Sequence, residues 1–203
     1  MNKVITISRE YGAGGHTIGK RVAQELGIEI YDKDIVRETV RASGFETEVV
    51  QEEEEDVSKA STFLKSLCSS SVHYRDPQEV IHEVQTAVIL QFAKKGPCVI
   101  LGRCGDYVLR ERPNVLRTFV YAPLETRIQF AKSRPDAKDM PDRLWETQLA
   151  KHDRARASYY NYYTENRWGE AKNYDLCLNA TLGREACADL IVAAARAMQE
   201  ANK

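Results

Sequence analysis

The sequence predicts an α/β fold built on a mainly parallel sheet. Short β-branched, apolar runs alternate along the chain with longer segments of helical periodicity. A run that is apolar throughout is typical of a parallel strand buried on both faces, and strand–helix alternation is typical of such sheets. The length of 203 residues suits one domain and suffices to bury a sizeable core. We therefore expect a single domain over residues 1–203.

The first half of the chain opens with the apolar run 4–7, which predicts a strand. Apolar residues spaced by four predict a helix over 16–26, and Gly27 is its expected C-terminal stop. A short strand at 28–31 and a helix at 34–42 are expected next. These segments form a strand–helix–strand–helix start.

The second ordered half begins at DPQE, residues 76–79. Asp76 predicts an N-cap, Pro77 suits the first helical position, and Glu79 completes a capping box. Valines at i+4 spacing extend this helix until Gly96 ends it. The remaining expected elements are strands at 98–101, 116–121 and 174–178, a short helix ending at 110, and helices at 124–132, 141–163 and 184–199.

Composition argues against several classes of function. The formal net charge is -1, so no overall field attracts nucleic acid or an anionic membrane. No run of about 18 apolar residues predicts a membrane span, and the N-terminus lacks a signal-peptide pattern. The five cysteines are scattered without a C-x-x-C pair, which argues against a zinc site and a disulfide frame. We expect reduced thiols in a cytoplasmic protein that binds neither nucleic acid nor membrane.

The glycine-rich stretch SREYGAGGHTIGKRVAQELG, residues 8–27, admits two registers as a phosphate-binding loop. The literal G-x-x-x-x-G-K match spans Gly14–Lys20, but an arginine follows it where Ser or Thr is expected. The second register starts the loop at Arg9, immediately after the strand, and starts the helix near His16–Thr17. A phosphate loop places a helix N-terminus directly beyond a strand end, which agrees with the second register.

Helical periodicity also favours the second register. Ile18 shares a face with Val22 and Leu26 only if it is already helical. The backbone N–H groups of residues 12–17 would then cradle an anion. The alternative is a tight strand-to-helix turn that binds no ligand.

The favoured register leaves the loop without its usual cation. Gly15 stands where a P-loop lysine reaches the phosphates, and His16 stands at the Ser/Thr position, with Thr17 as the nearest hydroxyl. The candidates for the missing positive charge are Arg9, His16, Lys20 and a basic lid. The expected phosphate-binding set comprises Arg9, Gly12, Ala13, Gly14, Gly15, His16, Thr17 and Lys20.

Six stretches follow one another along most of the chain. They are ITISREYGAGGHTIGKRVAQELG (5–27), YDKDIV (31–36), GPCVILGRCGDYVL (96–109), YAPLETR (121–127), DRARASYYNYYT (153–164) and NYDLCLN (173–179). In this order they resemble the cytidylate kinase-like family, which is related to the nucleoside monophosphate kinases. The resemblance implies a P-loop kinase-type three-layer sandwich with a five-stranded parallel sheet. It also implies an inserted monophosphate-binding lobe, here at 43–75, and a helical lid, here at 136–170.

The resemblance further implies an activity and residue roles. Arg103 matches an arginine that contacts the acceptor monophosphate, and Arg154 and Arg156 match lid arginines that close on the transferring phosphate. Thr17 matches the hydroxyl near the magnesium ion. The implied activity is phosphoryl transfer from ATP with Mg²⁺ to a nucleoside monophosphate, with CMP as the first expectation. The oligomeric state stays open, with a homodimer among the alternatives.

Two positions depart from true cytidylate kinases. Gly15 replaces the P-loop lysine, and Leu101 stands where an acidic residue would help to anchor magnesium. Phosphoryl transfer depends on positioning and charge stabilisation, which lysine and metal largely supply. The sequence therefore also admits a nucleotide-binding sensor with lost or weak transfer. A kinase for a non-nucleotide acceptor is a further alternative, because 43–75 lacks a readable base-recognition signature.

Several candidate residues have a structural alternative. Asp32 follows the second strand and is expected to hold a magnesium-bound water or orient an acceptor, but it would equally cap the next helix. Arg103 has a structural salt bridge as its alternative, and the lid arginines have helix-stabilising i,i+3 pairs as theirs. The tyrosines at 159–163 are expected to pack against the body rather than to stack on nucleic acid.

Overall fold

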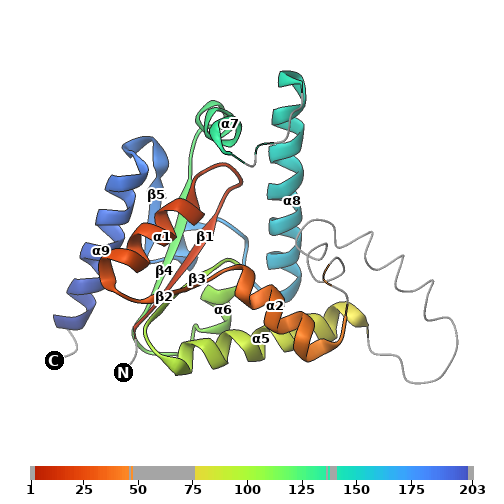
Figure 1. Cartoon of the computed structure of the whole chain (residues 1–203), viewed down its shortest axis with the longest axis vertical. Helices are drawn as coiled ribbons and strands as arrows, with labels where there is room; N and C mark the ends of the chain where they lie inside the picture. Colours follow the sequence, from red (N-terminus) through yellow and green to blue (C-terminus); the bar gives the residue numbers. More distant parts are fainter. Residues whose placement is uncertain (1–2, 46, 48–75, 136, 138–140, 201–203) are drawn as a thin grey trace, which may run out of the picture.

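The computed structural model of the chain describes residues 3–45, 47, 76–135, 137 and 141–200. Within them five strands form one parallel sheet in the order β2-β3-β1-β4-β5 (Figure 1). The strands are β1 (Val4–Arg9), β2 (Glu29–Tyr31), β3 (Cys98–Leu101), β4 (Val115–Tyr121) and β5 (Leu176–Asn179). The chain passes to one side of β1 and then to the other, so β1 lies at the switch of strand order. Open parallel sheets bind ligands beyond the carboxyl ends of the strands at such a point.

Helices cover both faces of the sheet and produce the predicted three layers (Figure 1). One face is covered by α1 (Gly15–Leu26) and α9 (Arg184–Glu200), and the other by α2 (Lys33–Ser43), α5 (Pro77–Lys95) and α6 (Gly105–Val108). Two helices, α7 (Leu124–Ser133) and α8 (Trp145–Tyr163), stand near the end of β1. Short 3-10 turns lie at Asp142–Leu144, Ala171–Asn173 and Ala180–Leu182. The predicted P-loop kinase-type sandwich is confirmed.

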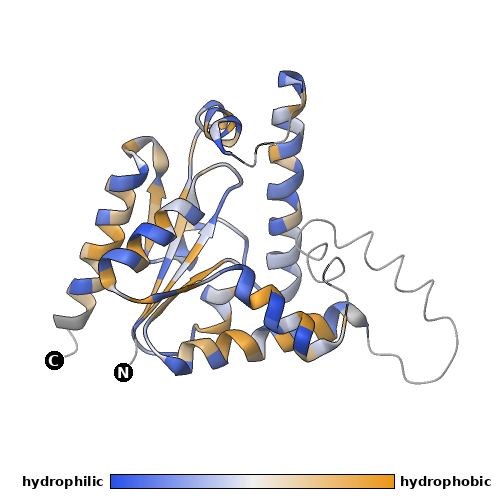
Figure 2. Cartoon of the chain, viewed as in Figure 1, coloured by the Kyte–Doolittle hydropathy of each residue, from blue (hydrophilic) through white to orange (hydrophobic). Residues whose placement is uncertain are grey.

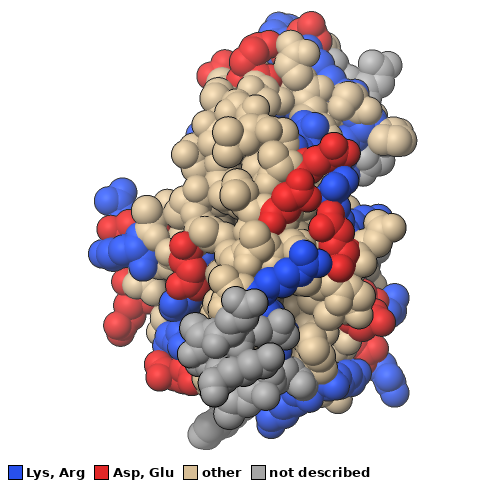
Figure 3. Space-filling view, turned by 90° about the vertical axis from the view of Figure 1, so that its left-hand side faces the viewer, with Lys and Arg blue, Asp and Glu red and all other residues tan. Residues whose placement is uncertain are grey.

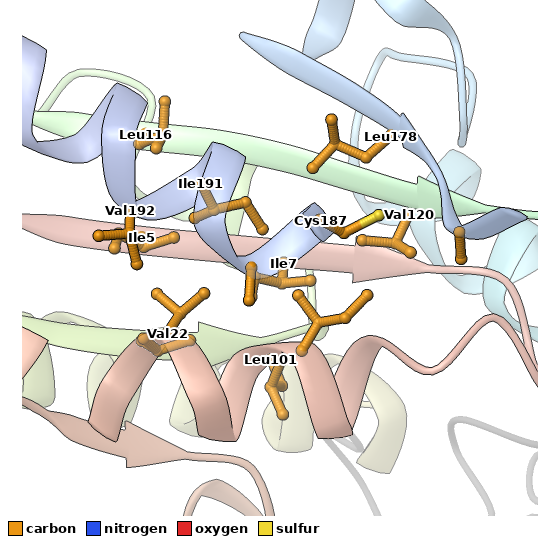
Figure 4. Close-up of a cluster of buried hydrophobic side chains, with 14 of the residues drawn as sticks. Ile5, Ile7, Val22, Leu101, Leu116, Val120, Leu178, Cys187, Ile191 and Val192 are labelled. Atoms are coloured by element: carbon orange, nitrogen blue, oxygen red, sulfur yellow. The ribbon is translucent and has the colours of Figure 1, made fainter. Parts of the chain in front are cut away.

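Alternate residues of the central strands enter two separate cores. Ile5 and Ile7 are fully buried and pack with α1 and α9 (Figure 4), whereas Val4 packs with α5 in the second core. The strands are apolar throughout because both of their faces are covered. Figure 2 shows hydrophobic residues along the strands and hydrophilic residues on the outer sides of the helices. Burial of one such side chain stabilises the fold by roughly 1.5–3 kcal/mol.

The predicted elements are present, with shifts at some ends. Asp76 caps α5 as expected, because its carboxylate accepts a hydrogen bond from the backbone N–H of Gln78 at 3.0 Å. The last strand begins at Leu176 rather than at residue 174. The reason is that Tyr174 packs its ring against Phe119, with ring centroids 5.0 Å apart, immediately after a 3-10 turn.

Part of the predicted domain organisation falls outside the described residues. The inserted lobe expected at 43–75 is described only at 43–45 and 47, so it stays a prediction. Of the lid expected at 136–170, residue 137 and residues 141–170 are described. Most of this segment is the long helix α8, whose C-terminal part lies against α5 (Figure 1).

The surface over α9 carries charges of both signs. Figure 3 views this side of the molecule, and Lys and Arg residues lie interspersed with Asp and Glu on its described part. Arg21 of α1, for example, lies 3.4 Å from Glu185 and 3.5 Å from Asp189 of α9. None of the helices in the described part of the chain combines the length and the apolar character that a membrane crossing requires.

Candidate functional site

The glycine-rich loop joins β1 to α1 at the carboxyl end of the central strand (Figure 1). Because α1 begins at Gly15, the second register is confirmed, although β1 runs on to Arg9 instead of ending at residue 7, so the loop comprises residues 10–14. The literal motif match over Gly14–Lys20 is not the loop, since all but its first residue are already helical. Ile18 and Val22 are fully buried, as the helical periodicity required.

The backbone conformation of the loop requires glycine at two positions. Gly12 has a φ of 79° and Gly14 a φ of 87°, a left-handed conformation that side chains other than hydrogen disfavour. A Cβ on Gly12 would lie 2.7 Å from the carbonyl oxygen of Arg127, and one on Gly14 would lie 2.6 Å from Nε of Arg184. The chain can therefore turn sharply into α1, whose first N–H groups lack acceptors within the helix and suit an anion.

A cavity of about 460 Å³ lies over this loop. It is lined by every residue of the predicted phosphate-binding set except Ala13, which is 1% exposed and packs into the core beneath the loop. Asp32 lines the cavity from the end of β2, and Phe130 and Arg134 line it from α7 and the residue that follows. With Arg156 of α8, the structure thus brings together residues from four separate parts of the sequence.

Arg9 runs across the base of the loop. A Cβ on Gly15 would lie 2.8 Å from both Cβ and Cγ of Arg9, so the arginine stem occupies the space beside that glycine. At the other end, Nη1 of Arg9 occupies the place that a Cβ on Gly102 would take. Two glycines, one after β1 and one after β3, therefore leave the room through which this side chain passes.

A second, smaller cavity of about 30 Å³ lies on the other side of Arg9. It is lined by Ser8, Arg9, Gly102, Arg103, Cys104, Arg156, Tyr159, Tyr160 and Trp168. Arg103 follows shortly after the end of β3, is 7% exposed and has a φ of 53°. Arg9 and Arg156 line both cavities, so these two cations mark the boundary between them.

A buried carboxylate lies close to the smaller cavity. Asp106 of α6 is 3% exposed and accepts hydrogen bonds from the hydroxyl of Tyr160 at 2.7 Å and that of Ser8 at 3.4 Å. Burial raises the pKa of this carboxyl above its ordinary value, although both hydroxyls favour the ionised form. No sequence pattern indicates this residue, because a single aspartate after a strand does not predict burial.

The two predicted lid arginines occupy different positions on α8. Arg156 is half-buried and donates from Nη1 to the backbone carbonyl of Arg9 at 3.0 Å, with its guanidinium 5.6 Å from the centre of the Tyr11 ring. Arg154 is exposed and belongs to the lining of neither of these cavities. The structure therefore places one of the two arginines against the loop.

A three-residue ionic cluster, absent from the predicted site, fixes the outer side of the loop. Arg127 of α7 lies between Asp153 of α8, which it contacts at 2.5 Å, and Glu10, which it contacts at 3.3 Å. Asp153 also accepts a hydrogen bond from the backbone N–H of Tyr11 at 2.7 Å. Burial raises the pKa of the Glu10 carboxyl, and the neighbouring Arg127 and the Ala122 amide oppose that rise. This cluster connects the loop to both α7 and α8.

Asp32 pairs with His16 in the lining of the larger cavity, with Oδ2 2.9 Å from Nδ1 of the imidazole. Asp32 stands at the N-cap position of α2 but its side chain makes no capping hydrogen bond, so the structure does not support the capping alternative for this residue. Asp34 instead pairs with Arg37. Asp32 and the exposed Thr17 hydroxyl line one cavity, as the predicted metal site requires.

These two groups fit a magnesium ion held largely by substrate. Among the described residues, no group of three His, Cys, Asp or Glu side chains is arranged to hold a metal alone. Mg²⁺ in phosphate-transfer sites takes one or two protein oxygens and completes its shell with phosphates and waters. Leu101 is fully buried under α1, where a Cβ on Gly19 would lie 3.0 Å from it, so the end of β3 supplies an apolar side chain.

The tyrosines of α8 pack mainly onto the body, as predicted. Tyr159 donates from its hydroxyl to Gln85 of α5 at 3.0 Å, and Tyr163 stacks on His82 with ring centroids 3.8 Å apart. Burial lowers the pKa of His82 from 6.5 to about 4, so the imidazole is neutral at pH 7. Tyr162 is 65% exposed. These contacts attach α8 to α5.

Comparisons with known proteins agree with this fold. A sequence profile of the cytidylate kinase-like family matches residues 4–182. A comparison with curated proteins finds no significant match. A solved structure of an uncharacterized protein from Eubacterium ventriosum has a TM-score of 0.70 at 23% identity, covering 96% of this chain and 98% of that one.

Two kinases of solved structure share the fold. Shikimate kinase from Acinetobacter baumannii, in complex with shikimate, has a TM-score of 0.52 at 15% identity and covers 95% of this chain and 91% of its own. A gluconokinase from Sinorhizobium meliloti has a TM-score of 0.53 at 14% identity and covers 98% and 94%. At such identities the likeness concerns the fold alone.

Proposed function

The chain belongs to the cytidylate kinase-like family, and from this premise we propose that it is an ATP-dependent phosphotransferase of the nucleoside monophosphate kinase type. The acceptor we propose is a pyrimidine nucleoside monophosphate, with CMP first. The observation that carries the proposal is the pair of cavities that meet at Arg9 and Arg156. A donor triphosphate over the loop and an acceptor phosphate beside Arg103 would then approach each other between two cations.

The proposed reaction is a direct transfer. An oxygen of the acceptor phosphate attacks the γ-phosphorus of ATP, and the bond from that phosphorus to the β–γ bridging oxygen breaks as the new bond forms. ADP leaves with the bridging oxygen and its electron pair. The loop N–H groups would bind the donor phosphates, and Arg156 would neutralise charge that develops during transfer.

Residues on both sides of the boundary have proposed roles. Arg103 would bind the acceptor phosphate, and a planar guanidinium suits that task because it donates two parallel hydrogen bonds. Asp32 and Thr17 would hold Mg²⁺, which would offset charge on the phosphates when bound. Arg154 would join Arg156 only on closure of the lid, because it is exposed in this structure.

A nucleotide sensor with weak or lost transfer is a second candidate. Gly15 and the buried Leu101 favour it, since the lysine and the β3 carboxylate of true cytidylate kinases are both missing. A kinase for a non-nucleotide acceptor is a third candidate, consistent with the variety of acceptors on this fold.

One experiment separates these candidates. The purified protein is incubated with Mg-ATP and a panel of nucleoside monophosphates, with shikimate added as a non-nucleotide acceptor, and the products are separated and quantified. Acceptor-dependent formation of CDP and ADP is the expected result. ATP binding without any phosphorylated product would refute the nucleoside monophosphate kinase proposal and favour the sensor or a kinase for a non-nucleotide acceptor outside the panel.

Variants of α8 test the proposed lid. Arg156→Ala is expected to reduce turnover by about 10²–10³-fold while ATP affinity changes little, because the arginine acts on developing charge. Lys151→Ala removes an exposed cation of the same helix and serves as the matched control. Equal turnover in wild type and Arg156→Ala would remove this residue from the mechanism.

A further inference from the structure

We infer that Arg9 replaces the missing P-loop lysine, an inference that rests on the proposed binding of a nucleotide polyphosphate by the loop. In the register confirmed by the structure, the first glycine of G-x-x-x-x-G-K falls on Arg9 and the lysine falls on Gly15. The cation and the glycine have exchanged positions across the loop. The motif therefore keeps one long cationic side chain and one position without a side chain.

Steric contacts support the exchange. The stem of Arg9 lies beside Gly15, where a Cβ would approach its Cβ and Cγ to 2.8 Å and its Cδ to 3.5 Å. A lysine at position 15 would need the space that Arg9 now fills. Arg9 is therefore compatible with glycine at position 15 and not with lysine there.

The guanidinium of Arg9 lies at the boundary between the two cavities, where donor and acceptor phosphates would meet. Arg9 is half-buried and lines both the loop cavity and the cavity beside Arg103. Gly102 has a φ of 69°, and its lack of a side chain leaves the place taken by Nη1 of Arg9. Arginine stays charged at all working pH values and can donate to two phosphate oxygens at once. One side chain can therefore contact donor and acceptor phosphates together.

The other candidate cations are placed less well. The imidazole of His16 is 47% exposed and pairs with Asp32. Lys20 lines the same cavity but is exposed on α1, beyond the first helical turn. Arg156 comes from the lid helix and donates to the carbonyl of Arg9. Arg9 lies at the end of β1, directly before the loop, and its stem lies beside Gly15 at the start of α1.

A swap experiment tests the inference. The variants are Arg9→Gly, Gly15→Lys and the double variant, with Arg9→Lys as the conservative change. Affinities for ATP, for inorganic tripolyphosphate and for adenosine are measured by calorimetry without acceptor, and folding is checked by circular dichroism and thermal melting. Arg41→Ala, which removes a side chain that is 81% exposed, is the charge control.

Arg9→Gly is expected to weaken ATP and tripolyphosphate binding at least tenfold while adenosine binding is unchanged. Gly15→Lys is expected to lower the melting temperature because of the clash. The double variant is expected to recover at least tenfold in ATP affinity over Arg9→Gly, and Arg9→Lys to stay within about fivefold of wild type. A folded Arg9→Gly variant with wild-type ATP affinity, or a double variant no better than Arg9→Gly, would overturn the inference.

These readouts separate the inference from the proposed function. If the wild type binds ATP through Arg9 but transfers no phosphate to any acceptor, the inference holds and the kinase proposal fails. If the wild type binds neither ATP nor tripolyphosphate, both fail.

Discussion

Replacement of Asp153 by alanine tests whether the ionic cluster supports the loop. Asp153 accepts from the Tyr11 N–H at 2.7 Å and contacts Arg127 at 2.5 Å. The side chains of Arg127 and Asp153 are 11% and 17% exposed, so neither group is well hydrated. Because both groups are largely removed from water, loss of one leaves the charge of the other buried without its partner. This lowers the free energy of unfolding.

The magnitude follows from these contacts. Loss of one partner of a fully buried ion pair costs about 3–5 kcal/mol, and loss of a hydrogen bond to a charged group costs about 1.5–3 kcal/mol. Glu10 still lies 3.3 Å from Arg127 in the variant and compensates part of its charge. We therefore expect Asp153→Ala to lower the free energy of unfolding by about 3 kcal/mol. Asp153→Asn should lose about half as much, because its amide oxygen can still accept from Tyr11.

Urea unfolding, followed by circular dichroism, measures both losses. The dependence of the unfolding free energy on urea concentration (the m-value) should be the same in the variants and the wild type. Asp189→Asn is the control, because Asp189 is a 59% exposed partner of Arg21 and should change stability by less than about 0.5 kcal/mol. ATP affinity should fall with Asp153→Ala, since the Tyr11 end of the loop is released. A loss below about 0.5 kcal/mol in both Asp153 variants would refute the supporting role of the cluster.

Three further predictions concern other parts of the fold. Because burial lowers the pKa of His82 from 6.5 to about 4, the unfolded chain takes up its proton first, so stability is full above pH 6.5 and falls toward pH 4. Urea unfolding at pH 7.5 and 4.5 should show that His82→Gln reduces this loss by about 2 kcal/mol, allowing for partial screening of the half-buried ring. Gly14→Ala should cost about 1–2 kcal/mol in the same assay through its left-handed φ, whereas Gly96→Ala, with nothing within 4 Å, should cost less. Iodoacetamide should modify the exposed Cys177 in the native protein before the buried cysteines among the described residues, as peptide mass spectrometry would show.

The register of the glycine-rich loop could be predicted from the sequence, because the apolar spacing that fixes it lies within one helix, α1. Ile18 and Val22 had to face the same core, and this favoured the second register over the literal motif match. The ionic cluster has no comparable signal. Arg127 and Asp153 are 26 positions apart in the sequence and belong to different helices, so only the packing of α7 and α8 at the end of the sheet brings them together.

Helix geometry explains the outcome for the two lid arginines. Residues two apart on an α-helix are separated by roughly 200° around its axis, so they point to nearly opposite sides. Because α8 is helical through both positions, only Arg156 contacts the loop in this arrangement, and Arg154 would reach it only if α8 took another position. The sequence contained this information, but the resemblance assigned both residues one role. The buried Asp106 and the closeness of Arg9 to Gly102 depend instead on how β1 and β3 pair, which no local pattern shows.

The position of Arg9 has a consequence that a lysine at the helix start would not have. A lysine at position 15 would approach the donor phosphates from the helix side of the loop, whereas Arg9 leaves the end of β1 and reaches Gly102 beside β3. Loss of the Arg9 side chain should therefore weaken the binding of both substrates and raise the KM for the acceptor as well as for ATP. Arg103 lines only the smaller cavity of the two, so its loss should raise the acceptor KM alone. Steady-state kinetics that showed the same pattern for both variants would contradict a guanidinium shared between the two cavities.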